Sequence, residues 1–193
     1  FMYNSVGFLS RPHGLTVLSS IISSSNYNLL AVYTHKLNPK SQDSSRSVRN
    51  DYHLFEEICT SKNIPIISVD SKNSNFKNFP ECDIIVEVSW RYLIPDTITK
   101  KAKIISFGIH RGKLPEYAGA EPIKQALVKN EKEIILSAHN LNAGIDAGEV
   151  LATISHKVNY NSKLSLDDNI QKIRDEITPK FSELLFITFS KFS

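Results

Sequence analysis

Short apolar runs and helix-like stretches alternate along most of the chain. Apolar runs predict strands at residues 5–9, 29–33, 64–69, 83–88 and 103–107. Helical spacing of apolar positions predicts helices at residues 15–24, 52–62 and 120–128, and a short helix beginning near Pro95. Because the strands are almost continuously apolar and helices separate them, the pattern predicts an α/β fold. This is a Rossmann-like, mostly parallel twisted sheet with helices on both faces.

The last third of the chain has a different pattern. Residues 133–141 and 149–158 are more amphipathic and predict two strands that flank the edge of the sheet. A final helix is expected over about residues 165–192, with Ser165 as its N-cap and with Pro179 breaking or kinking it. Its apolar run at residues 184–192 either packs on the core or, if exposed, forms a homodimer contact. No repeat or shift in composition divides the chain, so residues 2–193 are expected to form one domain.

Two polar stretches interrupt the pattern, at residues 38–50 and 71–80. The first is rich in Ser, Asn, Lys and Arg and has no apolar period, so it predicts a mobile loop. Pro65 is expected at the start of its strand, where the sheet needs no N–H donor.

Composition narrows the classes of function. Hydrophobic residues make up 41% of the 193 residues, and 23 Lys and Arg against 20 Asp and Glu give a net charge of only +3. This mild excess is not the concentrated basic surface of a nucleic-acid binder. No apolar run approaches the roughly 20 residues of a membrane span. Two cysteines without a CxxC pair predict a reduced, cytoplasmic protein, and histidines without ligand spacing predict no metal site.

Candidate chemistry gathers after the predicted strand at residues 103–107, because ligands of parallel sheets bind beyond the carboxyl ends of the strands. His110 lies there, in a stretch rich in glycine and proline. Asp146 follows in a turn between Gly144 and Gly148. A histidine and a carboxylate at one end of a sheet are compatible with acid–base catalysis, although spacing alone leaves a structural role for the histidine open.

These two segments resemble the signature of the folate-dependent formyltransferases, Asn-x-His-x-Ser-x-Leu-Pro-x-Tyr-basic-Gly with a later Asp-x-Gly. The matching residues are His110, Leu114, Pro115, Tyr117, Gly119, Pro122, His139, Asp146 and Gly148. The resemblance implies transfer of a formyl group from N10-formyltetrahydrofolate to a primary amine, without a metal. It also implies that His110 stabilises the oxyanion and carries a proton, and that Asp146 is its electrostatic partner.

The resemblance extends to the binding residues. It implies a folate pterin pocket formed by Ser89, Trp90, Arg91, Tyr92, Leu93 and Ile94, together with Gly144 and Ile145. It places the acceptor near Ser10, Arg11, His13, Gly112, Lys113, Tyr117, Gly119 and His139. For His139, a role beside the substrate and a role as a buried strand histidine both stay open.

Three positions depart from the signature. Gly108 replaces the catalytic Asn, Gly112 replaces the Ser, and Ala118 replaces the basic residue. Losing one oxyanion donor costs about 2.7–4 kcal/mol of transition-state stabilisation. Asn140 or Asn142 could supply the missing donor, His110 could suffice for a slow enzyme, or the chain could bind folate or a nucleotide sugar without turnover.

The expected acceptor of the formyl group follows from excluding other branches of the family. Residues 10–14 lack the run of small residues that cradles a phosphate in glycinamide ribonucleotide transformylases. The chain is also expected to lack both the C-terminal tRNA-binding domain of methionyl-tRNA formyltransferases and the N-terminal module of deformylases. The leading acceptor is therefore the amine of a nucleotide-linked amino sugar or of a similar small molecule. Activity like that of methionyl-tRNA formyltransferase is a further alternative.

Overall fold

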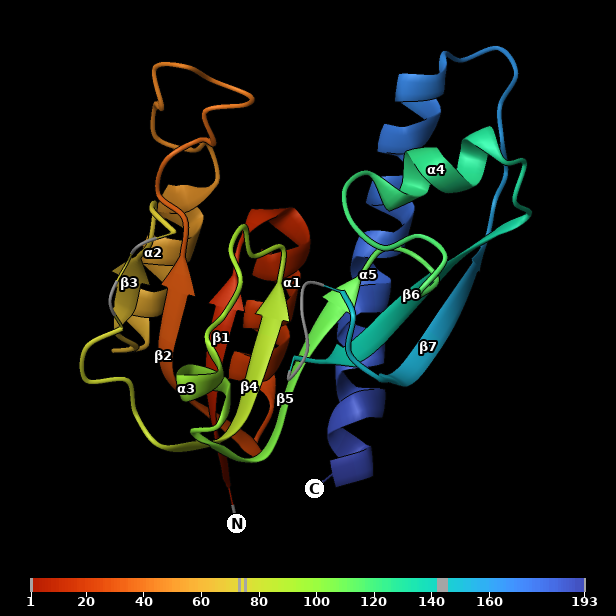
Figure 1. Cartoon of the computed structure of the whole chain (residues 1–193). Helices are drawn as coiled ribbons and strands as arrows, with labels where there is room; N and C mark the ends of the chain where they lie inside the picture. Colours follow the sequence, from red (N-terminus) through yellow and green to blue (C-terminus); the bar gives the residue numbers. More distant parts are fainter. Residues whose placement is uncertain (1, 73, 75, 142–145, 193) are drawn as a thin grey trace. The chain divides into compact units, whose positions relative to one another are not determined.

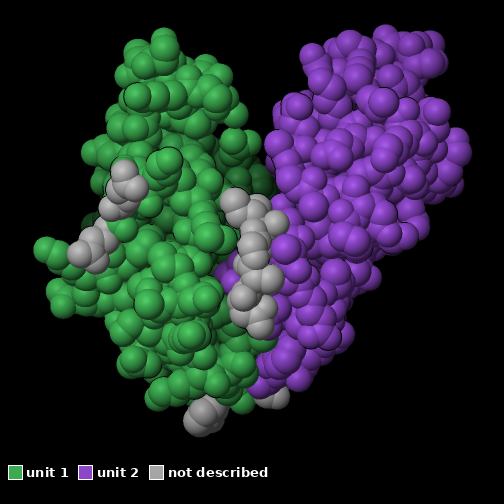
Figure 2. Space-filling model, in the orientation of Figure 1, with its two compact units in different colours: residues 1–106 green, residues 107–193 purple. Residues whose placement is uncertain are grey.

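The computed structural model describes residues 2–72, 74, 76–141 and 146–192 of the chain. It contains two compact units, Phe1–Ser106 and Phe107–Ser193 (Figure 2). The boundary between them falls within one strand. A single domain over residues 2–193 stays a prediction.

The first unit carries the parallel part of the sheet (Figure 1). Its strands are β1 (Tyr3–Leu9), β2 (Tyr27–Thr34), β3 (Ile66–Ser68), β4 (Cys82–Val88) and the first half of β5 (Ala102–His110). Its helices are α1 (Arg11–Ser23), α2 (Tyr52–Ser61) and α3 (Asp96–Thr99). Strand β1 pairs in parallel with β2 and β4, and β2 pairs in parallel with β3. The strand order of the sheet is β3-β2-β1-β4-β5-β6-β7, which confirms the predicted mostly parallel α/β fold.

An aromatic cluster fills the core of this unit around Phe8 of β1. The ring of Phe8 stacks on Tyr33 of β2 at 5.0 Å and on Phe79 at 5.9 Å, and Trp90 meets it edge-on at 5.0 Å.

Both cysteines are buried, and burial raises the pKa of Cys59 to about 11 and that of Cys82 to about 12. They are thus neutral core thiols rather than nucleophiles.

The loop expected to be mobile, residues 38–50, has a defined hydrogen-bonded structure instead. The carboxylate of Asp43 accepts hydrogen bonds from Ser45, Ser47 and Asn38, which hold its pKa well below the usual range. An isolated bridge joins Leu37 to Val48. These bonds are made by polar side chains, so a search for apolar periodicity does not detect them.

The second unit carries the antiparallel part of the sheet (Figure 1). It contains the end of β5, then α4 (Pro122–Val128), β6 (Glu133–Asn140), β7 (Val150–Lys157) and α5 (Leu166–Phe192). Strand β6 pairs antiparallel with both β5 and β7. Its core is made of fully buried side chains from β6 and α5, which include Leu136, Ile177, Phe181, Leu185 and Phe189.

Helix α5 begins as predicted and runs past Pro179 without a break. The hydroxyl of Ser165 accepts a hydrogen bond from the Asp168 N–H at 3.1 Å, which confirms the expected N-cap. The helix then continues through Pro179 to Phe192, within the expected range of about residues 165–192, so Pro179 does not break it; a kink at Pro179 stays a prediction. An internal proline costs about 3 kcal/mol, and the burial of Ile177 and Phe181 on either side of it offsets this cost. In the described part of the chain, no helix is long and apolar enough to cross a membrane.

Candidate active site

His110 is the last residue of β5, and its imidazole lies beside the carboxylate of Asp146. His110 Nδ1 is 3.4 Å from Asp146 Oδ2, and the two side chains are 10% and 13% exposed. Asp146 adopts a left-handed conformation with φ 53°. Its Oδ2 also accepts a hydrogen bond of 3.2 Å from the Gly119 N–H. The carboxylate is therefore held by the loop that follows His110, and it faces the ring.

The other ring nitrogen of His110 has a partner that fixes its proton. His110 Nε2 lies 2.6 Å from the carbonyl oxygen of Tyr117. A carbonyl can only accept, so Nε2 carries hydrogen and the nitrogen facing Asp146 is Nδ1. A proton on Nδ1 as well would make the ring a cation paired with the Asp146 carboxylate. The charged ring is the form that can stabilise negative charge on a reacting oxygen.

His139 approaches the same carboxylate from the neighbouring strand. Its Nε2 lies 3.4 Å from Asp146 Oδ1, and the residue is only 2% exposed. Burial is the main cause that lowers the pKa of His139, and His110 adds to it, whereas Asp146 opposes it. In the antiparallel pairing of β5 and β6, His139 stands opposite Gly108. His139 thus lies across from the position where the family signature has an asparagine.

Two glycines are dictated by close approach. A Cβ at Gly148 would lie 1.7 Å from the backbone oxygen of Asn140, so only glycine permits this contact. A Cβ at Gly112 would lie 2.7 Å from Pro122 Cβ and 3.1 Å from the carbonyl oxygen of Tyr117. The departure from the signature at position 112 therefore has a packing reason in this chain.

A small cavity lies beside the segment that holds His110. Its volume is about 70 Å³, and Gly112, Lys113, Tyr117 and Glu131 are among its lining residues. Drug-sized ligands occupy roughly 300–1,000 Å³. This cavity can hold water or a small group, but not an amino sugar nucleotide.

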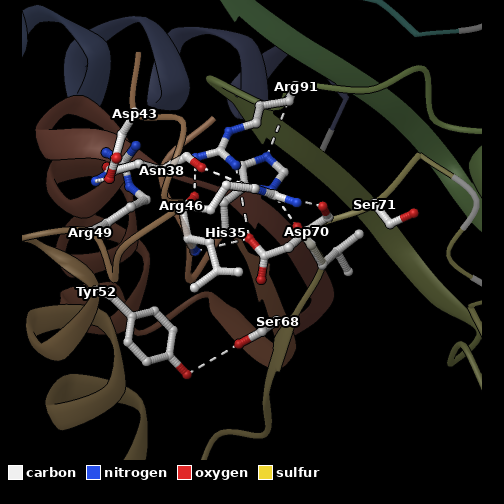
Figure 3. A network of polar contacts seen from close by, with 12 residues as sticks. His35, Asn38, Asp43, Arg46, Arg49, Tyr52, Ser68, Asp70, Ser71 and Arg91 are labelled. Carbon is white, nitrogen blue, oxygen red and sulfur yellow. Dashed lines mark hydrogen bonds and ion pairs between the residues drawn. The ribbon is translucent and has the colours of Figure 1, made fainter. Parts of the chain in front are cut away.

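The predicted pterin loop lies in the first unit and follows β4. Ser89 has φ 62°, and the Trp90 N–H donates to Glu87 Oε2 at 3.1 Å, which turns the chain sharply. Leu93 is 59% exposed, whereas Ile94 is buried. The Arg91 guanidinium donates to the Leu37 carbonyl at 2.5 Å and lies 3.8 Å from Asp70 (Figure 3). Its charged group therefore interacts with groups of the protein itself.

The predicted acceptor residues of the first unit lie at the start of α1. Ser10 is buried, and its N–H donates to the Val88 carbonyl, which ties the end of β1 to the end of β4. Arg11 has φ 66°, and His13 is buried. In the second unit, Lys113 is exposed and lies 4.0 Å from Glu116.

The chain matches the family described as formyl transferase over residues 19–181. This stretch is most of its length. The chain belongs to the formyl transferase family.

The curated relatives of this formyl transferase chain are formyltransferases too. It is 30% identical over 149 residues to a methionyl-tRNA formyltransferase of Orientia tsutsugamushi, covering 75% of this chain and 47% of that protein. It is 23% identical over 183 residues to the Rickettsia bellii enzyme of the same name, covering 95% and 58%. The chain thus spans about half the length of these relatives.

Solved structures of a formyltransferase and of a deformylase share the fold. A 4-N formyltransferase from Francisella tularensis superposes with a TM-score of 0.67 at 18% identity, covering 100% of this chain and 72% of that one. A formyltetrahydrofolate deformylase from Pseudomonas syringae gives a TM-score of 0.69 at 15% identity, covering 96% and 60%. At this identity the likeness shows a common fold.

Several residues assigned from the sequence keep the status of predictions in this formyl transferase. Asn142, Gly144 and Ile145 lie outside the described residues. Asn140 is at the end of β6, opposite Phe107 and one position from the partner of Gly108, so it lies near the place of the missing asparagine. No cluster of three metal-ligating side chains occurs within the described ranges.

Sequence reasoning missed two residues that act on the predicted ones. Glu131 accepts the phenol hydrogen bond of Tyr117 at 2.7 Å, and His35 accepts the Arg91 N–H at 3.1 Å. Neither belongs to the signature, and both meet their partners through the tertiary fold. No sequence signal could have identified them.

Proposed function

We propose that this protein transfers a formyl group from N10-formyltetrahydrofolate to a primary amine. The observation that carries the proposal is the His110–Asp146 pair at 3.4 Å, with Nε2 of the ring on the Tyr117 carbonyl. Membership of the formyl transferase family supports the reaction class. In this reaction the amine nitrogen forms a bond to the formyl carbon, the bond from that carbon to N10 breaks, and a proton passes from the amine to N10.

The described residues can serve two needs of that reaction. A cationic His110 ring would stabilise negative charge that develops on the formyl oxygen through its own positive charge, since both ring nitrogens face protein oxygens, and Asp146 would balance the charge of the ring. Asn140 and His139, on the strand beside Gly108, are the candidates for the donor that Gly108 cannot supply. Each lies within reach of that end of β5 through the antiparallel pairing.

The Ser89–Ile94 loop is the proposed site for the pterin. Among the described residues, Trp90 Nε1 is one of the buried side-chain nitrogens without a hydrogen-bond partner. An unsatisfied buried donor is costly, and a ligand oxygen or nitrogen would satisfy it. This donor fits a heterocycle that carries acceptors, as the pterin does.

The acceptor is one of two amines. The sequence favours a nucleotide-linked amino sugar, whereas the curated relatives favour the amino group of methionyl-tRNA. The alternative of a family member that binds folate or a nucleotide sugar without turnover is motivated by Gly108. The two enzymes would release tetrahydrofolate with different amines, and the binding protein would release none.

The test follows release of tetrahydrofolate from N10-formyltetrahydrofolate with each amine in turn. Wild type is compared with His110→Ala and Asp146→Asn. Release that needs an amine and falls about a hundredfold or more without His110 supports the enzyme and identifies the acceptor. Folate binding without release under any condition replaces the enzyme with a binding protein, and absence of folate binding refutes both.

A further inference from the structure

We propose that His35 is a positioning residue that sets the conformation of the Trp90–Tyr92 part of the pterin loop, and thereby the affinity for the folate. This inference rests on the proposed function for its ligand, but not for its geometry. His35 follows the last residue of β2 and is only 1% exposed. Its ring contacts three successive residues of the loop, Trp90, Arg91 and Tyr92. Figure 3 shows the contact with Arg91.

Both ring nitrogens of His35 are engaged with backbone groups. Nδ1 lies 2.5 Å from the carbonyl oxygen of Val69, and Nε2 lies 3.1 Å from the backbone nitrogen of Arg91. The carbonyl can only accept and the N–H can only donate, so hydrogen resides on Nδ1 and Nε2 accepts. The ring is therefore held as one neutral tautomer between the end of β3 and the pterin loop.

Two aromatic side chains of the loop also pack against the His35 ring. Trp90 stacks on His35 with ring centroids 4.1 Å apart and planes inclined by 26°. Tyr92 stands perpendicular to the same ring at 5.5 Å. Aromatic pairs in these geometries contribute about 0.5–1.5 kcal/mol of stabilisation, in addition to the contribution of the apolar area that they bury. One buried side chain thus fixes the rings that flank Arg91.

The surroundings exclude a charge on this ring. Burial is the largest cause that lowers the pKa of His35, to about 3, and Arg91, Arg49 and Arg11 lower it further, whereas the Val69 carbonyl raises it. The Asp70 carboxylate is occupied by Arg91 and by the Leu37 N–H. His35 consequently stays an acceptor toward Arg91 through the physiological pH range.

No residue of another type reproduces both parts of this contact. Phenylalanine keeps a ring against Trp90 but leaves the partly buried Arg91 N–H without its acceptor. Glutamine can offer an amide oxygen to that N–H but has no ring. The two variants therefore separate the hydrogen bond from the stack, and His53→Gln, at an exposed histidine of α2, is the matched control.

The tryptophan content of the chain makes a direct test available. Trp90 is its single tryptophan, so tryptophan fluorescence, excited beyond the absorption of the tyrosines, reports on this loop alone. Fluorescence emission and acrylamide quenching are measured without ligand for wild type, His35→Phe, His35→Gln and His53→Gln, together with thermal unfolding. We expect a changed emission maximum and increased quenching in both His35 variants and an unchanged signal in His53→Gln. Folded His35 variants with a wild-type Trp90 signal would overturn the inference.

Binding and turnover give the functional part of the test. Titration with 5-formyltetrahydrofolate, a non-reactive analogue, should show a dissociation constant raised about tenfold in the His35 variants, the equivalent of one lost hydrogen bond or stack. In turnover, KM for the folate should rise by about the same factor while kcat at saturating folate stays near that of wild type. A fall in kcat alone would contradict a positioning role. If wild type binds no folate, the proposed function fails, and the ligand-free fluorescence still decides the role of His35.

If the variants do not fold, the wild-type protein decides. Nitrogen NMR of the histidine side chains should show His35 as a neutral ring with hydrogen on Nδ1 at pH 6. A doubly protonated ring, or hydrogen on Nε2, would refute the proposed contact with Arg91.

Discussion

The phenol of Tyr117 donates a hydrogen bond of 2.7 Å to the carboxylate of Glu131. The backbone carbonyl of the same tyrosine accepts the hydrogen bond from His110 Nε2. Glu131 raises the pKa of the Tyr117 phenol, so the phenol remains a donor at neutral pH. The Tyr117–Glu131 pair therefore holds the carbonyl that fixes the proton on His110.

Loss of this pair should weaken the catalytic histidine. We expect Tyr117→Phe to lower kcat about fivefold, the equivalent of one hydrogen bond, because the Lys113–Ala118 turn loses a restraint. Glu131→Gln keeps an acceptor for the phenol and should lower kcat less. Steady-state kinetics with the amine that the tetrahydrofolate-release assay selects measures both, and equal activity of wild type and Tyr117→Phe would contradict the role.

Gly148 should tolerate no side chain. In Gly148→Ala the new Cβ would meet the Asn140 carbonyl at 1.7 Å, so the chain must shift or the contact must break. We expect the free energy of unfolding to fall by about 2–4 kcal/mol, in the range of severe overpacking. Urea denaturation measures it. Gly119→Ala is the matched control, because its Cβ meets nothing within 4 Å and only its φ of +85° opposes the change; its cost should be about 1–2 kcal/mol.

Gly108→Asn tests whether the oxyanion site is incomplete. If Gly108 has removed a donor that nothing replaces, the asparagine should raise kcat by up to about a hundredfold. The effect is measured as tetrahydrofolate release and must depend on His110. Gly112→Ser, the other return to the family signature, should bring no gain because its Cβ would crowd Pro122 and the Tyr117 carbonyl. An unchanged rate in Gly108→Asn would indicate that Asn140 or His139 already supplies the donor.

His35 should make the protein less stable in mild acid. Its pKa is about 3 when folded, below the ordinary value of 6.5, so the unfolded chain binds a proton that the folded protein excludes. Stability from this group is full above pH 6.5 and is lost as the pH falls from there toward 3. Between pH 7 and 5 the loss is about 2 kcal/mol. Urea unfolding gives the free energy of unfolding at pH 7 and at pH 5. The decrease from pH 7 to pH 5 should be smaller in His35→Gln than in wild type by this amount. Equal pH dependence of the two proteins would contradict it.

The sheet was predictable because its strands are nearly continuous apolar runs. The run at residues 83–88 became Cys82–Val88, and that at 29–33 became Tyr27–Thr34. The strand expected to end at residue 107 continues to His110, because Gly108 and Ile109 are buried and pair with β6. Periodicity gives the existence of a strand more surely than its last residue.

The candidate site was only partly accessible from the sequence. The signature located His110 and Asp146, and the distance between them comes from the structure. The contacts of His35 with Arg91, 56 positions away, depend on how β2, β3 and the loop after β4 meet. The loop at residues 38–50 escaped for another reason, since its bonds are polar and local.

That loop also has a consequence for sequence change within the family. Its fold depends on one carboxylate, Asp43, and on the hydroxyls of Ser45 and Ser47. Its other anchor is Arg46, which donates to the backbone carbonyl of Asp70. Asn38 also donates to Asp43 and Ser47. Natural variation should therefore be selected against at Asn38, Asp43, Ser45, Arg46 and Ser47 and tolerated at the other positions of the loop.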